Sequence, residues 1–139
     1  MAEREVVTLD SEGRIEPMPS VVTVAAIVYA LHSFAIVVGL IGAATVVGSF
    51  LGSIPSIAAV ILNYIKRGDA RGTWVESHYR WQIRTFWFAL LWAAIGWLFI
   101  ITFVGVFIGA PILIALTVWL IYRIARGWLR LGDRKPMYV

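Results

Sequence analysis

Most side chains in this sequence that could take part in chemistry lie in one stretch, residues 74–85. Glu76, Arg80 and Arg84 follow at intervals of four residues, so they share one face if the stretch is helical. A neighbouring stripe at similar spacing carries aromatic and polar side chains, namely Trp74, His78, Trp81 and Thr85. Two interpretations fit this pattern. It is typical of an interfacial helix that faces anionic headgroups, and equally of a docking surface for a partner protein.

His32 is a second candidate, because it is the only residue between Val21 and Ile65 that titrates near neutral pH. A polar side chain inside an apolar run is often functional in a membrane protein. The alternative is a neutral imidazole that hydrogen-bonds a neighbouring helix, through Ser33 or Asn63. We therefore treat His32 and Asn63 as a candidate intramembrane polar site.

The sequence contains little that could support catalysis. It has no cysteine, which excludes disulfides, thiol catalysis and thiolate metal sites. Of its eight acidic residues, five lie in the first twenty positions. His78 has no second metal ligand at a suitable spacing, and no phosphate-binding loop or paired carboxylates occur. We predict that the protein is not an enzyme and has no cofactor or metal site.

Composition indicates which elements must position these residues. Hydrophobic residues make up 60% of the 139 positions and charged residues 14%, whereas soluble domains average roughly 45–50% and about 25%. Two uncharged runs, 18–65 and 85–122, each exceed the about 20 residues that cross a bilayer. Alternating segments typical of a membrane barrel do not occur. The fold class is therefore all-α integral membrane protein.

Each apolar run is too long for one crossing and must turn back. As a single helix, residues 21–65 would extend about 68 Å, against a hydrocarbon core of ~30 Å. The predicted helix breaks are the glycines and prolines of each run: Gly48, Gly52, Pro55, Gly105, Gly109 and Pro111. The Gly-x-x-x-Gly spacings also fit helix packing, although the neighbouring prolines favour turns. A first turn nearer 39–42, with Pro55 as a kink, is the alternative.

These breaks predict four transmembrane helices at about 21–47, 53–66, 80–107 and 111–130, within a membrane domain of residues 21–131. They form two hairpins joined by a basic, aromatic cytoplasmic loop, 66–84. Residues 1–20 are a flexible acidic tail and 132–139 a C-terminal tail. Positive charge gathers in the loop and near the C-terminus, which predicts that both, and hence both termini, are cytoplasmic. The same distribution argues against nucleic-acid binding.

The two hairpins share a pattern. Gly48-x-Phe50-x-Gly52 followed by Pro55 corresponds to Gly105-x-Phe107-x-Gly109 followed by Pro111. Ala70-Arg71-Gly72-x-Trp74 is likewise echoed by Ala125-Arg126-Gly127-Trp128. The pattern fits either an internal duplication or the chance recurrence of short Gly/Pro motifs in membrane helices. A duplication would relate the hairpins by an axis along the membrane normal.

The centre of the chain resembles a widespread family of small bacterial membrane proteins of unknown function. The residues concerned are Tyr64-Ile65-Lys66-Arg67-x-Asp69-Ala70, then Glu76-Ser77-His78, and the closing stretch 124–136. The chain departs from the family at Trp81-Gln82-Ile83-Arg84, where an Asn-Phe-Gln element is usual. The family is often grouped with the four-span import component of the chloroplast inner envelope. The resemblance implies a four-helix fold in a bacterial inner membrane. It implies a role in translocation only weakly.

Three functions fit these observations. The first is an accessory or scaffold subunit that binds a larger membrane assembly through the Trp74–Arg84 face. The second is a channel or transporter formed by a homo-oligomer, in which His32 is the one specific residue. The third is a membrane protein that binds anionic lipid through its basic cytoplasmic rim. The sequence favours the first, with the lipid bilayer as the one certain partner.

Overall fold

The computed structural model describes residues 7–42 and 46–138, and their regular structure is helical. The helices are α1 (Pro19–Ile41), α2 (Val46–Lys66), α3 (Glu76–Ile101), the short 3₁₀ helix η1 (Phe103–Gly105) and α4 (Val106–Gly132). By length and composition α1, α3 and α4 are each long and apolar enough to cross a membrane. The predicted all-helical fold is thus confirmed for the described residues, and three of its helices have the length and composition of membrane spans.

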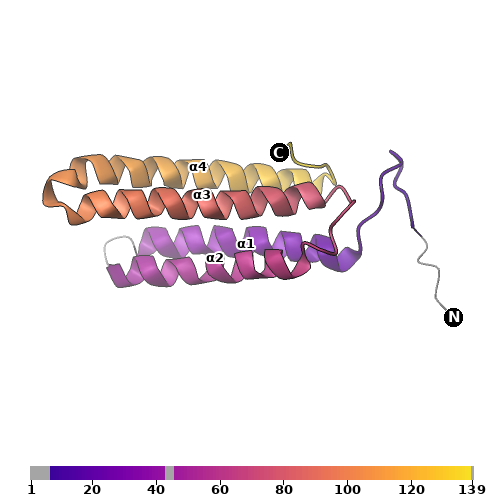
Figure 1. Cartoon of the computed structure of the whole chain (residues 1–139), viewed down its shortest axis with the longest axis horizontal. Coiled ribbons are helices and arrows are strands. Elements are labelled where there is room, and N and C mark those ends of the chain that lie inside the picture. Colours follow the sequence, from indigo (N-terminus) through magenta and orange to yellow (C-terminus); the bar gives the residue numbers. More distant parts are fainter. Residues whose placement is uncertain (1–6, 43–45, 139) are drawn as a thin grey trace.

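The four long helices are arranged in two pairs. Helices α1 and α2 contact each other along their length, as do α3 and α4 (Figure 1). We call these the first and second pair. The loop 67–75, the N-terminal segment from residue 7 and the residues that follow α4 up to 138 lie at one end of the bundle, which we call the basic end (Figure 1). We call the opposite end the open end. The second pair extends further towards the open end than the first.

The predicted break in the first pair is wrong. Helix α1 ends at Ile41 and α2 begins at Val46, so Gly48, Gly52 and Pro55 all lie inside α2. The alternative turn nearer 39–42, with Pro55 inside a helix, is closer to the structure. At 21 residues, α2 is about 31 Å long, comparable to a ~30 Å hydrocarbon core, whereas a helix over 53–66 would be too short.

In the second pair the predicted break is right only in part. The turn includes Gly105, which lies in η1, but Gly109 and Pro111 belong to α4. Helix α3 also begins at Glu76 instead of near residue 80, and it ends at Ile101. Half of the predicted loop 66–84 is therefore helical, and the connection between the pairs is only 67–75. Ala70 and Val75 are fully buried and fix this connection to the core.

The glycines inside the helices allow close packing within each pair. A Cβ on Gly52 would lie 2.8 Å from the Cα of Gly39, and a Cβ on Gly109 would lie 2.6 Å from the carbonyl oxygen of Gly96. Each contact joins glycines that are 13 positions apart in the sequence. Gly52 and Gly109 are also the glycines matched by the proposed repeat, so the matched residues make equivalent contacts. Backbones that approach this closely are typical of small-residue packing in membranes.

The N-terminal segment, for which a flexible tail was predicted, forms a small turn where the structure describes it. Leu9 and Ile15 form an isolated β-bridge, and the Asp10 carboxylate accepts the backbone N–H of Arg14 at 2.8 Å and its Nε–H at 2.7 Å. These bonds, the backbone bond above all, lower the pKa of Asp10. Glu16 pairs with Arg134 at 2.5 Å, which joins the two tails. Residues 1–6 of the predicted tail lie outside the described part of the chain.

Candidate functional site

At the basic end, polar side chains of α3 bind the backbone of α1. The Tyr79 hydroxyl donates to the carbonyl of Val21 at 2.9 Å, and the Gln82 amide donates to that of Ala25, also at 2.9 Å. Both side chains are almost completely buried. The two acceptors lie one helical turn apart on α1, so these bonds fix the register of the second pair on the first. Hydrogen bonds of this kind, together with packing, hold helices together where hydrocarbon surrounds them.

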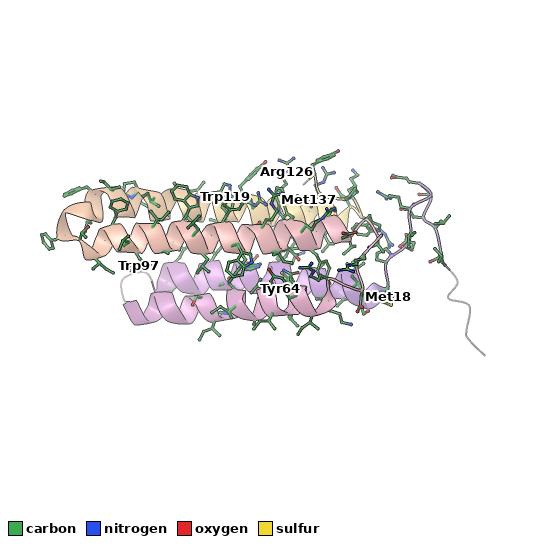
Figure 2. The ribbon with its side chains drawn as sticks, viewed as in Figure 1. Met18, Tyr64, Trp97, Trp119, Arg126 and Met137 are labelled. Carbon is green, nitrogen blue, oxygen red and sulfur yellow. The ribbon has the colours of Figure 1, made fainter. Side chains whose placement is uncertain are left out.

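His78 extends this network to the C-terminal tail. Its Nε2 lies 2.7 Å from the carbonyl oxygen of Lys135, and its Nδ1 lies 3.0 Å from the Tyr29 hydroxyl. A carbonyl only accepts, so Nε2 carries the proton, and Nδ1 of the neutral ring accepts the Tyr29 proton. Trp74 packs edge-on against the imidazole. The tail continues to Met137 (Figure 2). The Met137 N–H donates to Ser77 Oγ at 2.8 Å.

Trp81 binds α4. Its indole N–H donates to the carbonyl of Arg123 at 3.3 Å, and the Arg123 guanidinium lies 3.5 Å from the centroid of the Trp81 ring. Arg123 Nε–H also donates to the Thr85 hydroxyl at 2.7 Å. The guanidinium is thus held by a cation–π contact and a hydrogen bond within the bundle. Together these bonds connect α3 to α4 beside the contacts to α1.

This burial corrects the predicted docking surface. Trp74 is 5% exposed and His78 is fully buried, so neither can contact a partner. Thr85 is buried as well and Trp81 is half-buried, so the stripe follows the inner face of α3, with Trp74 just before the helix. Sequence spacing correctly placed these residues on one face of the helix. It did not indicate that this face is turned inward, because Trp and His suit a membrane boundary and a polar core equally well.

The charged stripe faces outward and lines a cavity of about 430 Å³. Glu76, Arg80 and Arg84 share this face of α3, as their spacing predicts. The cavity is completed by residues from the same helix and from the end of α2 and its loop: Arg67, Arg71, Tyr79 and Ile83. We call it the arginine cavity. It brings four guanidinium groups from two parts of the chain around one space.

The arginine cavity has an excess of positive charge. Four guanidinium groups face a single carboxylate, and the Oε2 atom of that carboxylate, in Glu76, already accepts the N–H of Gly72 at 3.0 Å. Within the described part of the chain, the four arginines form no ion pair. The Tyr79 hydroxyl is also engaged, by Val21. What remains is a set of guanidinium donors, which suit phosphate oxygens in number and geometry.

The predicted intramembrane pair does not form one site. His32 is buried, and its Nδ1 lies 3.0 Å from the Ser56 hydroxyl, not from Ser33 or Asn63. The Ser33 hydroxyl instead donates to the carbonyl of Tyr29. Asn63 is fully buried in α2, and its side-chain amide has no hydrogen-bond partner among the described residues. His32 thus does bond a neighbouring helix, as one interpretation predicts, but through a different residue.

Sequence reasoning missed several members of these sites. It identifies Arg67 and Arg71 only as topological charges, because nothing in the sequence places them opposite Arg80 and Arg84. Gln82 had a usable signal, since it follows His78 by four residues on the inner stripe. Two further residues of the network were missed: Tyr29 had a similar signal as a phenol inside an apolar run, whereas Arg123 resembles an ordinary charge at a membrane boundary.

No protein-family model, curated protein or solved structure matches this chain. The resemblance to the small four-helix bacterial family therefore stays a prediction. Within the described ranges, no group of three or more His, Asp or Glu side chains could hold a metal ion.

Proposed function

We propose that this protein is a four-span membrane protein whose basic end binds the phosphate of an anionic lipid in the cytoplasmic leaflet. The observation that carries the proposal is the arginine cavity. Four exposed arginines that share one carboxylate and have no ion pair in the described chain attract a counter-ion. Where loops meet a membrane surface, the counter-ion at the highest local concentration is a lipid phosphate.

The distribution of charge supports the membrane orientation in this proposal. The loop 67–75 and the C-terminal residues lie at the same end of the bundle (Figure 1), where residues 66–84 and 123–135 each carry five arginines and lysines. By the positive-inside rule this end is cytoplasmic. Helix α2 then serves as the fourth span, the two pairs form the two predicted hairpins, and both termini are cytoplasmic. We place the protein in a bacterial inner membrane, as the resemblance implies.

Single cysteines test the four-span topology directly, because the chain has none of its own. We expect Gly68→Cys and Asp133→Cys to react with an impermeant maleimide only after the cytoplasmic side is opened. Gly42→Cys and Phe103→Cys should react from outside in intact cells. Labelling of positions 42 and 68 from the same side would show that α2 does not cross.

Spin-labelled lipids test the headgroup preference. The full chain is reconstituted in phosphatidylcholine, and electron paramagnetic resonance measures the motionally restricted fraction of labelled phosphatidylglycerol or phosphatidylcholine. A basic residue near an anionic surface contributes about 1 kcal/mol, roughly fivefold in affinity. We therefore expect Arg80→Gln to lower the preference for phosphatidylglycerol by about that factor.

Arg126→Gln is the matched control, since Arg126 is an exposed arginine of α4 outside the arginine cavity. Equal losses for Arg80→Gln and Arg126→Gln would mean that general rim charge, not the cavity, attracts the lipid. An equal preference of the wild-type chain for both lipids would refute the proposal.

A second proposal keeps the accessory role. The exposed Arg80 and Arg84 form a charged surface that an acidic segment of a larger membrane protein would fit, although the aromatic half of the predicted surface is buried. Gentle extraction of the tagged chain, followed by identification of what co-purifies, tests this role. A stoichiometric partner that is lost from the Arg80→Glu, Arg84→Glu variant, with membrane insertion unchanged, would favour it over lipid binding.

A further inference from the structure

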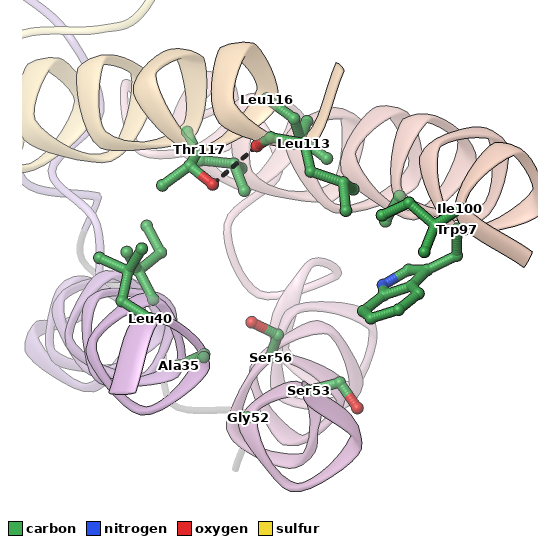
Figure 3. A pocket seen from close by; sticks show the side chains of 14 residues that line it. Ala35, Leu40, Gly52, Ser53, Ser56, Trp97, Ile100, Leu113, Leu116 and Thr117 are labelled. Atoms are coloured by element: carbon green, nitrogen blue, oxygen red, sulfur yellow. Dashed lines mark hydrogen bonds between the residues drawn. The ribbon is translucent and has the colours of Figure 1, made fainter. Parts of the chain in front are cut away.

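An apolar groove separates the two pairs beyond the polar network. Two cavities, of about 450 and about 350 Å³, lie between the first and second pair. They share six lining residues, Ile36, Ser53, Ser56, Ala93, Leu116 and Leu120, so they are adjacent parts of one space. Figure 3 shows the side chains of Trp97, Leu113 and Leu116 across this space from Ala35 and Ser56. We call this space the groove, and its larger part the inner cavity.

The wall of the inner cavity is almost entirely hydrocarbon. Among its polar members, His32 Nδ1 bonds the Ser56 hydroxyl and the Thr85 hydroxyl donates to the carbonyl of Trp81, whereas the buried His32 Nε2 has no hydrogen-bond partner among the described residues. Ile57 of α2 and Leu90 of α3 also line it and are 45% and 49% exposed. The inner cavity is therefore open sideways between α2 and α3, towards surrounding lipid. An apolar space in this position suits a hydrocarbon chain.

The groove and the arginine cavity lie along one face of α3. Tyr79 and Ile83 line the arginine cavity, Phe86, Leu90 and Ala93 line the inner cavity, and Trp97 and Ile100 line the remainder of the groove. These residues follow at alternating steps of four and three, the spacing of a single helical stripe. Opposite α3, Arg67, which directly follows α2, lines the arginine cavity, and Ile57 of α2 lines the inner cavity. The seam between α2 and α3 thus joins a cationic cavity to an apolar one.

The dimensions of the seam match one leaflet. From Ile83 to Ala93 the helix rises ~15 Å, which is half of a hydrocarbon core of ~30 Å. Between the two levels, the Trp87 indole donates to the Tyr64 hydroxyl at 3.0 Å across the seam. Exposed tryptophan and tyrosine are typical of the boundary between headgroups and chains.

From this alignment we infer that the seam binds one anionic diacyl phospholipid, with its phosphate in the arginine cavity and one acyl chain in the inner cavity. The Tyr64–Trp87 bond lies beside its glycerol and ester groups. This inference rests on the proposed function, which concerns only the headgroup. It adds a specific binding site for one acyl chain, which we call the acyl-chain site. The protein then holds the lipid as a bound ligand instead of meeting it as bulk solvent.

Photo-crosslinking tests the position of the bound acyl chain. The full-length protein is reconstituted with phosphatidylglycerol that carries a diazirine midway along one chain, or with phosphatidylcholine carrying the same chain. Mass spectrometry then maps the labelled peptides. We expect phosphatidylglycerol to label Leu90, Ala93, Leu116 and Leu120 about fivefold more than phosphatidylcholine does, because the headgroup selects the lipid.

A pair of variants separates the groove from the lipid-facing surface. Ala93→Phe fills the inner cavity, whereas Ala94→Phe places the same ring on the exposed side of α3. Groove labelling should fall severalfold in the first variant and stay unchanged in the second, while both keep the headgroup preference measured by spin label. Equal labelling in the two variants would overturn the inference.

The outcomes of this experiment are distinguishable from failure of the proposed function. If phosphatidylglycerol is preferred but labels only outward residues of the wild-type protein, such as Leu91 and Leu98, headgroup binding stands and the acyl-chain site is refuted. If wild-type protein shows no headgroup preference, both proposals fail. Soluble glycerol 3-phosphate can also be added as a competitor at the same concentration as the lipid. If it removes all labelling of the groove, the acyl-chain site is refuted as well. Even if the Ala93→Phe variant does not fold, the labelling map of the wild-type protein supports or refutes the acyl-chain site.

Discussion

The two ends of this bundle are held together in different ways. At the basic end, side chains of α3 donate to backbone carbonyls of α1, and His78 joins Tyr29 to the C-terminal tail. Towards the open end, glycine contacts hold each pair together internally, but a groove separates one pair from the other. Hydrocarbon gives apolar helix faces little reason to associate. Polar bonds therefore determine where the two pairs meet.

The largest effect at the basic end is expected from a substitution that separates α1 from α4. A Cβ on Gly127 would overlap the hydroxyl and ring of the buried Tyr29. We expect Gly127→Ala to lower the free energy of unfolding by about 3 kcal/mol, because the ring it would displace is buried and bonded to His78. Thermal unfolding in detergent, followed by tryptophan fluorescence, measures it. Gly132→Ala is the control, since a Cβ there meets nothing within 4 Å; equal effects would contradict the packing described.

One substitution made at both ends sharpens the contrast. Ala25 is fully buried at the basic end, whereas Ala93 lines the groove. We expect Ala25→Leu to lower the free energy of unfolding by about 2 kcal/mol through overpacking, and Ala93→Leu to change it by less than about 0.5 kcal/mol. Chemical unfolding in the same detergent compares the two. A larger cost at position 93 would show that the groove is not space the protein can fill.

A single hydroxyl tests the polar bonds themselves. Tyr29→Phe leaves Nδ1 of the buried His78 without its donor. We expect a loss of about 1 kcal/mol in the free energy of unfolding, since interhelical hydrogen bonds in membranes are modest. Tyr122→Phe serves as the control, because the Tyr122 hydroxyl accepts only from the exposed Arg126. If both variants unfold like the wild-type chain, hydrogen bonding is not what closes the basic end.

The smallest effect lies outside the membrane, at the N-terminal turn that extends the basic end. The pKa of Asp10 lies below its ordinary value of 3.8, mainly through the backbone N–H of Arg14. The carboxylate therefore stabilises the turn fully above pH 3.8, and this stabilisation is lost as pH falls through the lower folded pKa. NMR titration of the Arg14 amide should follow that lower pKa, and Asp10→Asn should abolish the transition. A midpoint above 3.8 would contradict the assigned bonds.

Apolar patterning predicted the helical class because it depends on composition, which a bilayer constrains strongly. It did not locate the first turn, because the sequence does not distinguish a glycine that ends a helix from one that packs against another helix, as Gly52 packs against Gly39. Helical spacing placed Glu76, Arg80 and Arg84 on one face correctly. It could not show that Trp74 and His78 face inward, nor that Arg67 joins Arg80, because those facts depend on how α2 and α3 meet.

The equal spacing of the glycine contacts bears on the ancestry of the chain. Gly52 and Gly109 are offset by 57 positions, Pro55 and Pro111 by 56, and Arg71 and Arg126 by 55. One residue gained or lost between two contacting glycines would rotate a helix by about 100° and remove the contact. If one gene segment was doubled, deletions were therefore tolerated only beyond the glycines, towards the basic end. Under such a duplication the two halves would stay alike in their crossings, and the arginine cavity would form where the end of the first copy meets the start of the second.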